Sequence, residues 1–274
     1  IPGAGEIYLG NYEKAFLYIF PYTLTIAAAI NKDSTSVAAF SQVSFDLHMF
    51  SVFDTYRDAR IALNNQGYQY QISKKSFVEL MKAPFNSANL FCGYSLFVVG
   101  ESIVTLSVYY LLNKESSNKN SSLESEKQLN FSEKLGVSAL LGTLGYLFFT
   151  PIAVSEEGFF RGFLQGSFNE IMDKNFSLFI TSTFFGLIHI PQVLTDSDAV
   201  KDQAGVLGEL KYMVPFRFFT AFSGGLLFGA IFNNENGNID YAITAHTLSN
   251  TLVVMVSPFI VNKIPLNFCL TCLM

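Results

Sequence analysis

Residues 155–162 read Ser-Glu-Glu-Gly-Phe-Phe-Arg-Gly and place Glu156, Glu157 and Arg161 inside an otherwise apolar run, Pro151–Met172. About twenty apolar residues are enough for a helix to cross a membrane. A charged side chain near the bilayer centre costs roughly 2.5–3.5 kcal/mol, so three charges this close together are unlikely to serve packing alone. The run therefore predicts a functional site within a membrane helix.

The three charges divide into a pair and a single acid. On a helix, Glu157 and Arg161 are four residues apart with the acid nearer the N-terminus, which favours an ion pair. Glu156 lies about 100° around the helix from its neighbour, because a helix has 3.6 residues per turn. We therefore expect Glu156 to face a cavity and to act on a substrate.

The start of this helix follows from two residues before the charges. Thr150 and Pro151 are typical of an N-cap followed by the first helical position. The sequence thus predicts that the helix starts afresh at Pro151. At 1.5 Å per residue, Glu156 would then lie about 8 Å below the helix start, near one membrane surface.

The composition is that of an integral membrane protein. Of 274 residues, 50% are hydrophobic and 14% are charged, and 29 Phe and 13 Tyr are spread over several apolar runs. The net charge is −5 and no Lys/Arg cluster is present, which argues against a nucleic-acid partner. The three Cys are too few for a disulfide framework, and one C-x-x-C pair lacks the ligands of a closed zinc site.

The apolar runs predict an all-α fold, a polytopic membrane helix bundle of about eight transmembrane helices with the site inside the C-terminal helices. Three spans fall in residues 1–112, and five fall in residues 135–274, the catalytic membrane domain. Between them, residues 113–134 form a polar linker. The predicted spans are Ala15–Ile30, Ser36–Phe53, Ala88–Leu112, Leu135–Phe149, Pro151–Met172, Phe176–Leu194, Val214–Phe232 and Ile239–Val261.

Isolated polar residues in the first spans have no partner that the sequence identifies. Asp46 and His48 lie on different helix faces, so we interpret His48 as structural. Glu101 is a lone acid in its span, and a role in function or in helix packing is open. The basic residues of 54–82 place that connection on the cytoplasmic side.

Glycines repeat at intervals of four residues in two of the C-terminal spans. Small residues at this spacing allow a neighbouring backbone to approach closely. We therefore expect these glycines to serve helix packing and to affect the site only indirectly. They are Gly158, Gly162 and Gly166 in one span, and Gly225 and Gly229 in another.

Two of the three histidines lie in the last spans. His189 comes near a helix end, and His246 and Asn250 are four apart and share a helix face. If the loops alternate sides, His246 enters the membrane from the side opposite to Glu156. The groups then meet only if the last helix is tilted or begins within the membrane.

Three motifs on successive hydrophobic helices together resemble the CAAX-protease and bacteriocin-processing (CPBP, or ABI) family of intramembrane endopeptidases. The resemblance covers roughly Leu135–Val261. Each motif alone is weak, and their order is what makes the resemblance specific. The motifs are Glu-Glu-x-x-x-Arg (Glu156, Glu157, Arg161), Phe-x-x-x-His (Phe185, His189) and His-x-x-x-Asn (His246, Asn250).

The resemblance implies a role for each residue. Glu156 would be the general base that activates water, and His189 would help to position that water. His246 and Asn250 would stabilise the oxyanion, which agrees with their capacity to donate two hydrogen bonds. Glu157 and Arg161 would orient the helix face.

A zinc-dependent form of the same protease is the alternative, with Glu156, His189 and His246 as three ligands. The metal-binding motif H-E-x-x-H is absent, so we favour a mechanism without a cofactor.

The sequence thus predicts an endopeptidase in a multi-pass protein of the bacterial cytoplasmic membrane. Its expected partners are a peptide or protein substrate, with a lipidated one as the family option, and the lipid bilayer. A non-catalytic transporter or immunity factor is the alternative function. The endopeptidase is favoured because an ion pathway would spread its acids over several spans, whereas here they cluster.

Overall fold

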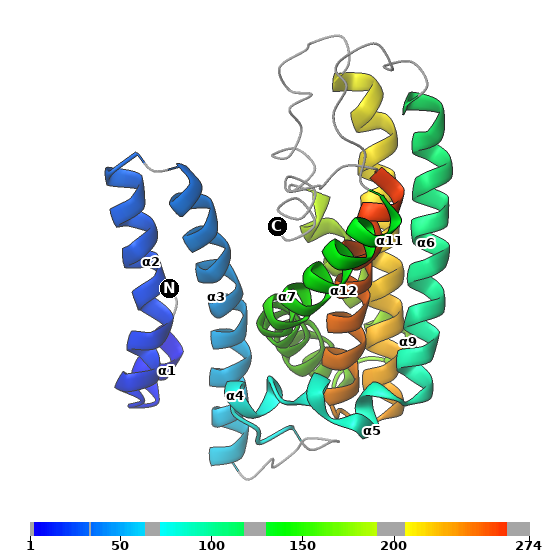
Figure 1. Cartoon of the computed structure of the whole chain (residues 1–274). Helices are drawn as coiled ribbons and strands as arrows, with labels where there is room; N and C mark the ends of the chain where they lie inside the picture. The colour runs from blue at the N-terminus through cyan, green and yellow to red at the C-terminus, as the bar shows by residue number, and fades with distance from the viewer. Residues whose placement is uncertain (1–2, 33, 64–71, 118–129, 191–205, 262–274) are drawn as a thin grey trace.

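The computed structural model describes residues 3–32, 34–63, 72–117, 130–190 and 206–261. Every regular element in these residues is a helix, and none of them is a β-strand (Figure 1). This confirms the all-α class that the sequence predicts.

The N-terminal half is a helical hairpin followed by short helices and one long helix. The hairpin helices α2 and α3 pack against each other, and the short α1 contacts both. Figure 1 shows α1 and α2 at the outer edge of the molecule, with α3 between them and the remaining helices. The elements are α1 (Ala4–Tyr8), α2 (Tyr12–Ile30), α3 (Ser34–Ala62), α4 (Phe77–Leu80), η1 (Ala83–Phe85), α5 (Ser87–Leu90) and α6 (Gly93–Ser117).

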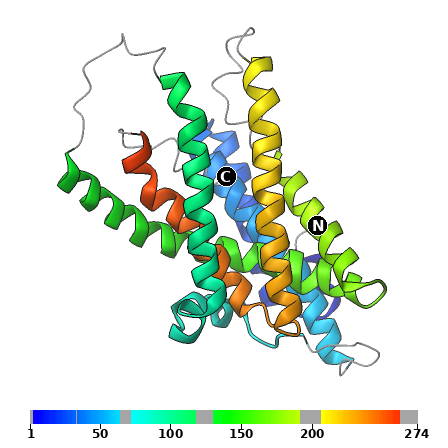
Figure 2. The ribbon, with the colours of Figure 1, turned by 90° about the vertical axis from the view of Figure 1, so that its right-hand side faces the viewer.

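The C-terminal half contains the helices that carry the three motifs. Helix α12 contacts α7 and α11 of this half and also α6 of the N-terminal half. Figure 2 shows α7 running obliquely to α6 and α11. The elements are α7 (Phe131–Glu157), the π-helix η2 (Gly158–Gln165), α8 (Gly166–Asn169), α9 (Lys174–Ile188), α11 (Val206–Asn234) and α12 (Asp240–Val261).

Side-chain caps explain where several of these helices begin. Ser76 and Glu79 form a capping box at α4, and Asn130 and Glu133 form another at α7. Asp173 accepts hydrogen bonds from two backbone N–H groups at the start of α9. Each cap satisfies N–H groups that have no partner within the helix.

The prediction that a helix starts at Thr150 and Pro151 was wrong. One continuous helical run extends from Phe131 to Asn169, and Pro151 lies inside it. The Thr150 hydroxyl donates to the carbonyl of Tyr146 within this helix instead of capping a new one. Proline is tolerated within membrane helices, where neighbouring helices and Ser/Thr side chains can satisfy the freed backbone groups.

The predicted depth of Glu156 was wrong for the same reason. Glu156 is the twenty-sixth residue of α7, so about 38 Å of helix precedes it at 1.5 Å per residue. The predicted depth of about 8 Å below a membrane surface assumed a helix start at Pro151, so it no longer holds.

Two helical stretches among the described residues are long and apolar enough to cross a membrane. They are Phe131–Asn169 and Val214–Asn234, and Gly93–Val104 is a shorter apolar stretch. The first joins two of the predicted spans into one element. A total of about eight spans remains a prediction.

The predicted polar linker of residues 113–134 is helical at both ends. Helix α6 continues to Ser117, and α7 begins at Phe131. Residues 118–129 lie outside the described residues, so the division into two domains stays a prediction.

Glycines permit two close contacts in the helix packing. The Phe53 ring of α3 lies against Gly162 so closely that a Cβ on this glycine would overlap it. A Cβ on Gly225 would come within 3.1 Å of the Ser182 Cα. The predicted close approach of two backbones is thus found at Gly225, whereas at Gly162 the neighbour is an aromatic side chain.

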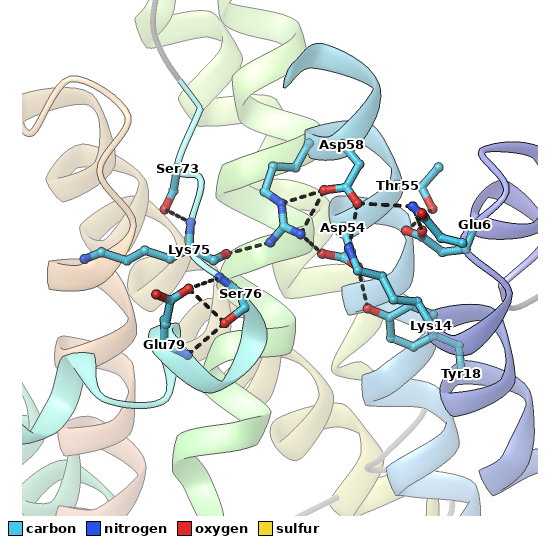
Figure 3. A network of polar contacts seen from close by, with 12 residues as sticks. Glu6, Lys14, Tyr18, Asp54, Thr55, Asp58, Ser73, Lys75, Ser76 and Glu79 are labelled. Atoms are coloured by element: carbon cyan, nitrogen blue, oxygen red, sulfur yellow. Dashed lines mark hydrogen bonds and ion pairs between the residues drawn. The ribbon is translucent and has the colours of Figure 1, made fainter. Parts of the chain in front are cut away.

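A second group of buried charges joins the hairpin helices (Figure 3). We call Glu6, Lys14, Asp54, Arg57 and Asp58 the hairpin network. The Lys14 ammonium lies 2.6 Å from Asp58 and 3.2 Å from Asp54, and Arg57 pairs with the same two carboxylates. Oxygens of the three acids lie within 4.8 Å of one another, and the two cations pair with two of these acids, Asp54 and Asp58.

The pKa values of this network reflect its internal pairing. Burial alone would raise the pKa of the Asp58 carboxyl, but hydrogen bonds from Lys14 and Arg57 lower it below its ordinary value of 3.8. Burial alone would lower the pKa of the Lys14 ammonium, but Asp58 and Asp54 raise it. Both groups are therefore held in their charged forms, as in a structural ion-pair network.

Candidate active site

A cavity of about 130 Å³ lies among α3, α6, α7, α9, α11 and α12. Five of the seven residues that the motifs name line it, namely Glu156, Phe185, His189, His246 and Asn250. They come from three helices that are far apart in the sequence. The structure therefore brings the acid, both histidines and the amide to one place.

Glu156 lies in the last turn of α7 and is largely buried. Its Oε2 atom lies 3.7 Å from Nε2 of His246. Within the described part of the chain this oxygen has no hydrogen-bond partner. Glu156 as a residue lines the cavity, so its carboxylate has acceptor capacity that a molecule there can use.

Glu157 and Arg161 are completely buried, and neither is among the residues that line the cavity. Arg161 Nε lies 3.0 Å from Glu157 Oε2, an ion pair whose atoms are not aligned for a hydrogen bond. The predicted pairing is thus confirmed. The guanidinium carbon also lies 5.2 Å from the centre of the Phe185 ring, within the range of a cation–π interaction.

Glu157 has a second partner on another helix. Its Oε1 atom lies 2.9 Å from Nδ1 of His246 on α12. The His246 ring also stacks on Phe228, with ring centres 4.8 Å apart and planes 17° apart. Glu157 therefore connects Arg161 to His246 and fixes the orientation of the imidazole.

His189 is the C-cap residue of α9. Its Nδ1 atom lies 2.6 Å from the carbonyl oxygen of Phe185, one helical turn earlier. A carbonyl only accepts hydrogen bonds, so the proton is on Nδ1 and a neutral ring has a lone pair on Nε2. The Phe of the second motif thus sets the histidine tautomer through its backbone.

The backbone widens directly after the two glutamates. Residues Gly158–Gln165 form a π-helix between α7 and α8. Such wide turns are rare and occur frequently at functional sites. This feature was not predicted from the sequence, although the glycines at both ends of the Phe-Phe-Arg segment were the signal available.

Three further residues of the cavity, with charged or amide side chains, were missed or left without a role. Gln42 of α3, Glu101 of α6 and Arg217 of α11 all line it. Arg217 is a charged residue within a predicted apolar span, and this signal could have identified it. His48 is not among the lining residues and instead contacts Tyr22 edge to face, at 6.5 Å.

The zinc alternative can be compared with the positions of its ligand atoms. Among the described residues, one group of three acids or histidines has ligand atoms all within 4.8 Å of one another, and it is Glu6, Asp54 and Asp58. The atoms of Glu156, His189 and His246 are not this close, so as arranged they do not fit a three-ligand zinc site.

Comparison with known families supports the motif assignment. Residues 136–252 match the family described as type II CAAX prenyl endopeptidase, Rce1-like. Over these residues the chain is similar to the CAAX protease family. The match includes all three motifs. No curated protein and no solved structure matches the chain significantly.

The similarity to the CAAX protease family indicates the class of protein. The family consists of membrane-embedded endopeptidases, which are hydrolases that act on a peptide or protein. The apolar helices of the chain are consistent with a place in a membrane.

Proposed function

We propose that this protein is a multi-pass membrane endopeptidase in which Glu156 activates the water that attacks the peptide bond. Its roughly eight spans lie in the bacterial cytoplasmic membrane, and its site lies inside the C-terminal helices. The observation that carries the proposal is the position of the Glu156 carboxylate, whose Oε2 has no hydrogen-bond partner among the described residues at a cavity shared with His189, His246 and Asn250.

Glu156 and His189 act on the water. The Glu156 carboxylate accepts one proton of the water as its oxygen bonds to the scissile carbonyl carbon. The Nε2 lone pair of His189 accepts the other hydrogen in a hydrogen bond, because Nδ1 donates to the Phe185 carbonyl. This contact orients the water before it attacks.

His246 and Asn250 stabilise the oxyanion that forms. The Asn250 amide donates one hydrogen bond. His246 donates from Nε2 as the protonated imidazole, because its Nδ1 proton is directed to Glu157. The Glu157 carboxylate stabilises this protonated ring and holds its orientation, the role that an acid plays beside the histidine of a catalytic triad.

Collapse of the tetrahedral intermediate completes the hydrolysis. The bond between carbon and nitrogen breaks, and Glu156 returns the proton to the leaving amine. The products are a carboxylic acid and an amine, the acid's proton then passes to the amine to give a carboxylate and an ammonium, and Glu156 is again ionised. These reaction steps involve no oxidation or reduction, so they need no redox partner.

The substrate that the family name suggests is a protein or peptide with a C-terminal Cys-a-a-X motif, whose cysteine carries a prenyl group. Hydrolysis after the cysteine releases the last three residues. A prenyl chain would enter the bilayer, which brings the scissile bond to the membrane-embedded site.

The test is cleavage by the purified protein in detergent. Peptides ending in Cys-a-a-X, with and without a prenyl group, are incubated with and without a chelator, and the products are identified by mass spectrometry. We expect cleavage after the cysteine that the chelator does not reduce. Loss of activity with the chelator, and its return with zinc, would instead support the zinc-dependent form. Absence of cleavage in every peptide would favour a non-catalytic transporter or immunity factor.

A further inference from the structure

A buried acid on α3 lies near the candidate active site and has no role in the proposed chemistry. Asp46 is buried and, unlike Asp54 and Asp58 of the hairpin network, it has no cation partner among the described residues. Its carboxyl group also lies close enough to Glu156 for the two acids to interact electrostatically. Burying an acid near another acid without a cation is costly. A residue kept at such a position is a candidate for a functional role.

The hydrogen bond that Asp46 receives comes from a residue of the cavity. The Gln42 amide nitrogen donates to Asp46 Oδ1 at 3.1 Å, one helical turn away on α3. Gln42 lines the cavity, whereas Asp46 does not. The bond fixes the Gln42 amide by its nitrogen and so leaves the amide oxygen, Oε1, as a free acceptor. Within the described part of the chain this oxygen has no hydrogen-bond partner, and it is not among the enclosed polar atoms.

The same face of α3 packs against the helices of the site. Gln42, Asp46 and Met49 are spaced by four and three residues, so they share one helix face. Met49 belongs to a buried cluster with Phe160 and Phe185, and Phe185 lines the cavity. The pair formed by Gln42 and Asp46 is therefore a part of the wall of the site.

A peptide in this cavity needs acceptors for its backbone N–H groups. In the proposed mechanism, His246 and Asn250 donate to the scissile carbonyl, while Glu156 and His189 act on the water. None of these four accepts a hydrogen bond from the N–H of a neighbouring peptide bond. An N–H group that is removed from water and left without a partner is costly. The oriented oxygen of Gln42 is an acceptor of the kind that this N–H requires.

We infer that Gln42 binds the substrate by accepting a hydrogen bond from a backbone N–H close to the scissile bond, and that Asp46 holds the Gln42 amide in position. This inference rests on the proposed function of the same cavity. It assigns a binding role to α3, which lies outside residues 136–252 that match the family. The N-terminal helices then complete the substrate site in addition to supporting it.

The experiment removes each partner of this hydrogen bond separately. A cleavable peptide is compared with versions in which one of the two amide bonds on either side of the scissile bond is an ester. An ester removes the N–H but keeps the length of the chain. The peptides are assayed with the wild type and with Gln42→Met, which keeps the side-chain length but loses the amide. The matched control is Thr220→Val, which removes a hydroxyl of the same cavity that donates to the Phe216 carbonyl.

We expect one ester to lower the wild-type kcat/KM about 3- to 10-fold more than the other esters do, as for one hydrogen bond, chiefly through a higher KM. In Gln42→Met this extra loss should disappear, because the acceptor is already absent. Thr220→Val should keep the extra loss. Thermal unfolding in detergent shows whether each variant is folded.

Two substitutions test the positioning role of Asp46. Asp46→Asn keeps an oxygen that can accept from the Gln42 nitrogen, so the extra loss with the ester should be retained. Asp46→Leu removes the acceptor, and the extra loss should shrink. A change of charge near Glu156 alters the rate on all peptides alike, so it cancels when the ester is compared with the parent peptide.

The possible failures are distinguishable. If no ester stands out in the wild type, or if the same ester stands out equally in folded Gln42→Met, the role of Gln42 is overturned and the proposed function stands. An undiminished extra loss in Asp46→Leu would overturn the positioning role of Asp46. Absence of cleavage of the parent peptide by the wild type would refute the proposed function and this inference together.

Discussion

The molecule buries acids in two places, and only one of them is arranged for chemistry. In the hairpin network, Lys14 and Arg57 neutralise Asp54 and Asp58. In the candidate active site, Arg161 and His246 share Glu157, while Glu156 beside them lines a cavity. Buried charge therefore does not by itself mark an active site. A buried carboxylate that retains unused acceptor capacity at a cavity does.

Helix α3 connects the two places. It carries Asp54, Arg57 and Asp58 of the hairpin network. The residue before Asp54, Phe53, packs its ring against Gly162 of η2, which belongs to the same continuous helical run as Glu156. The hairpin thus supports the helix that carries Glu156. The substitutions that follow are designed to separate support from chemistry, beginning with the largest expected effect.

Breaking the Glu157–Arg161 pair should have the largest effect on stability. Either Glu157→Ala or Arg161→Ala leaves a buried charge without its partner, which costs about 3–5 kcal/mol. Both variants should also lose activity, because Glu157 orients His246. Unfolding in detergent measures the stability. The double variant should be more stable than the sum of the two single losses predicts, and simple additivity would contradict direct pairing.

Removing one oxyanion donor should affect the rate and not the fold. We expect Asn250→Ala to lower kcat by about 10²- to 10³-fold with little change in KM, because the contact forms in the transition state. His246→Ala should show a comparable loss of kcat. Metal analysis of both purified variants tests zinc ligation, since in that case only His246→Ala would lose bound metal. An Asn250→Ala enzyme with unchanged kcat would remove this residue from the mechanism.

The contact between α3 and η2 should be sensitive to the addition of one methyl group. In Gly162→Ala the new Cβ overlaps the Phe53 ring, so we expect a loss of about 1–3 kcal/mol. The matched control is Gly136→Ala on α7, where a Cβ meets no atom within 4 Å. The control should be neutral or stabilising by up to about 1 kcal/mol. Equal stability of the two variants would mean that the Phe53 contact is unimportant.

The hairpin network should show the smallest effect, and one that depends on pH. The pKa of Asp58 is lower in the folded protein than its ordinary value of 3.8, so its charge stabilises the fold above that value. Asp58→Asn should therefore cost about 1 kcal/mol at neutral pH, where the partners are partly exposed. The difference should shrink as the pH falls below 3.8 and vanish below the folded pKa. A constant difference across this range would contradict the assignment.

The sequence predicted that Glu156, His246 and Asn250 share one site, but it did not predict the side-chain contacts between the helices that carry them. The charge of Glu156 in an apolar run and the spacing of His246 and Asn250 are local patterns, and all three residues line the cavity. The contact between Glu157 and His246 joins residues 89 positions apart. No local pattern encodes it, because it depends on how α7 packs against α12.

The helix boundary at Pro151 shows where local rules failed. Thr150 and Pro151 have the propensities of a helix start. In the structure, Phe149, Ile152 and Val254 form a buried cluster across this point, and this packing favours a continuous helix. Arg217 was missed although a cation in an apolar span is a local signal, whereas its place in the cavity depends on the packing of α11.

The most direct test of this account is the cleavage rate of Glu156→Gln, measured on the same peptides as the wild type and beside Asp58→Asn as a control. Glutamine keeps the shape of the side chain but cannot accept the proton, so we predict a loss of at least about 10²-fold in kcat with an unchanged unfolding temperature. Asp58→Asn, which removes a carboxylate from the hairpin network, should retain its activity. Cleavage by folded Glu156→Gln at the wild-type rate would contradict the central claim, because the base would then lie elsewhere.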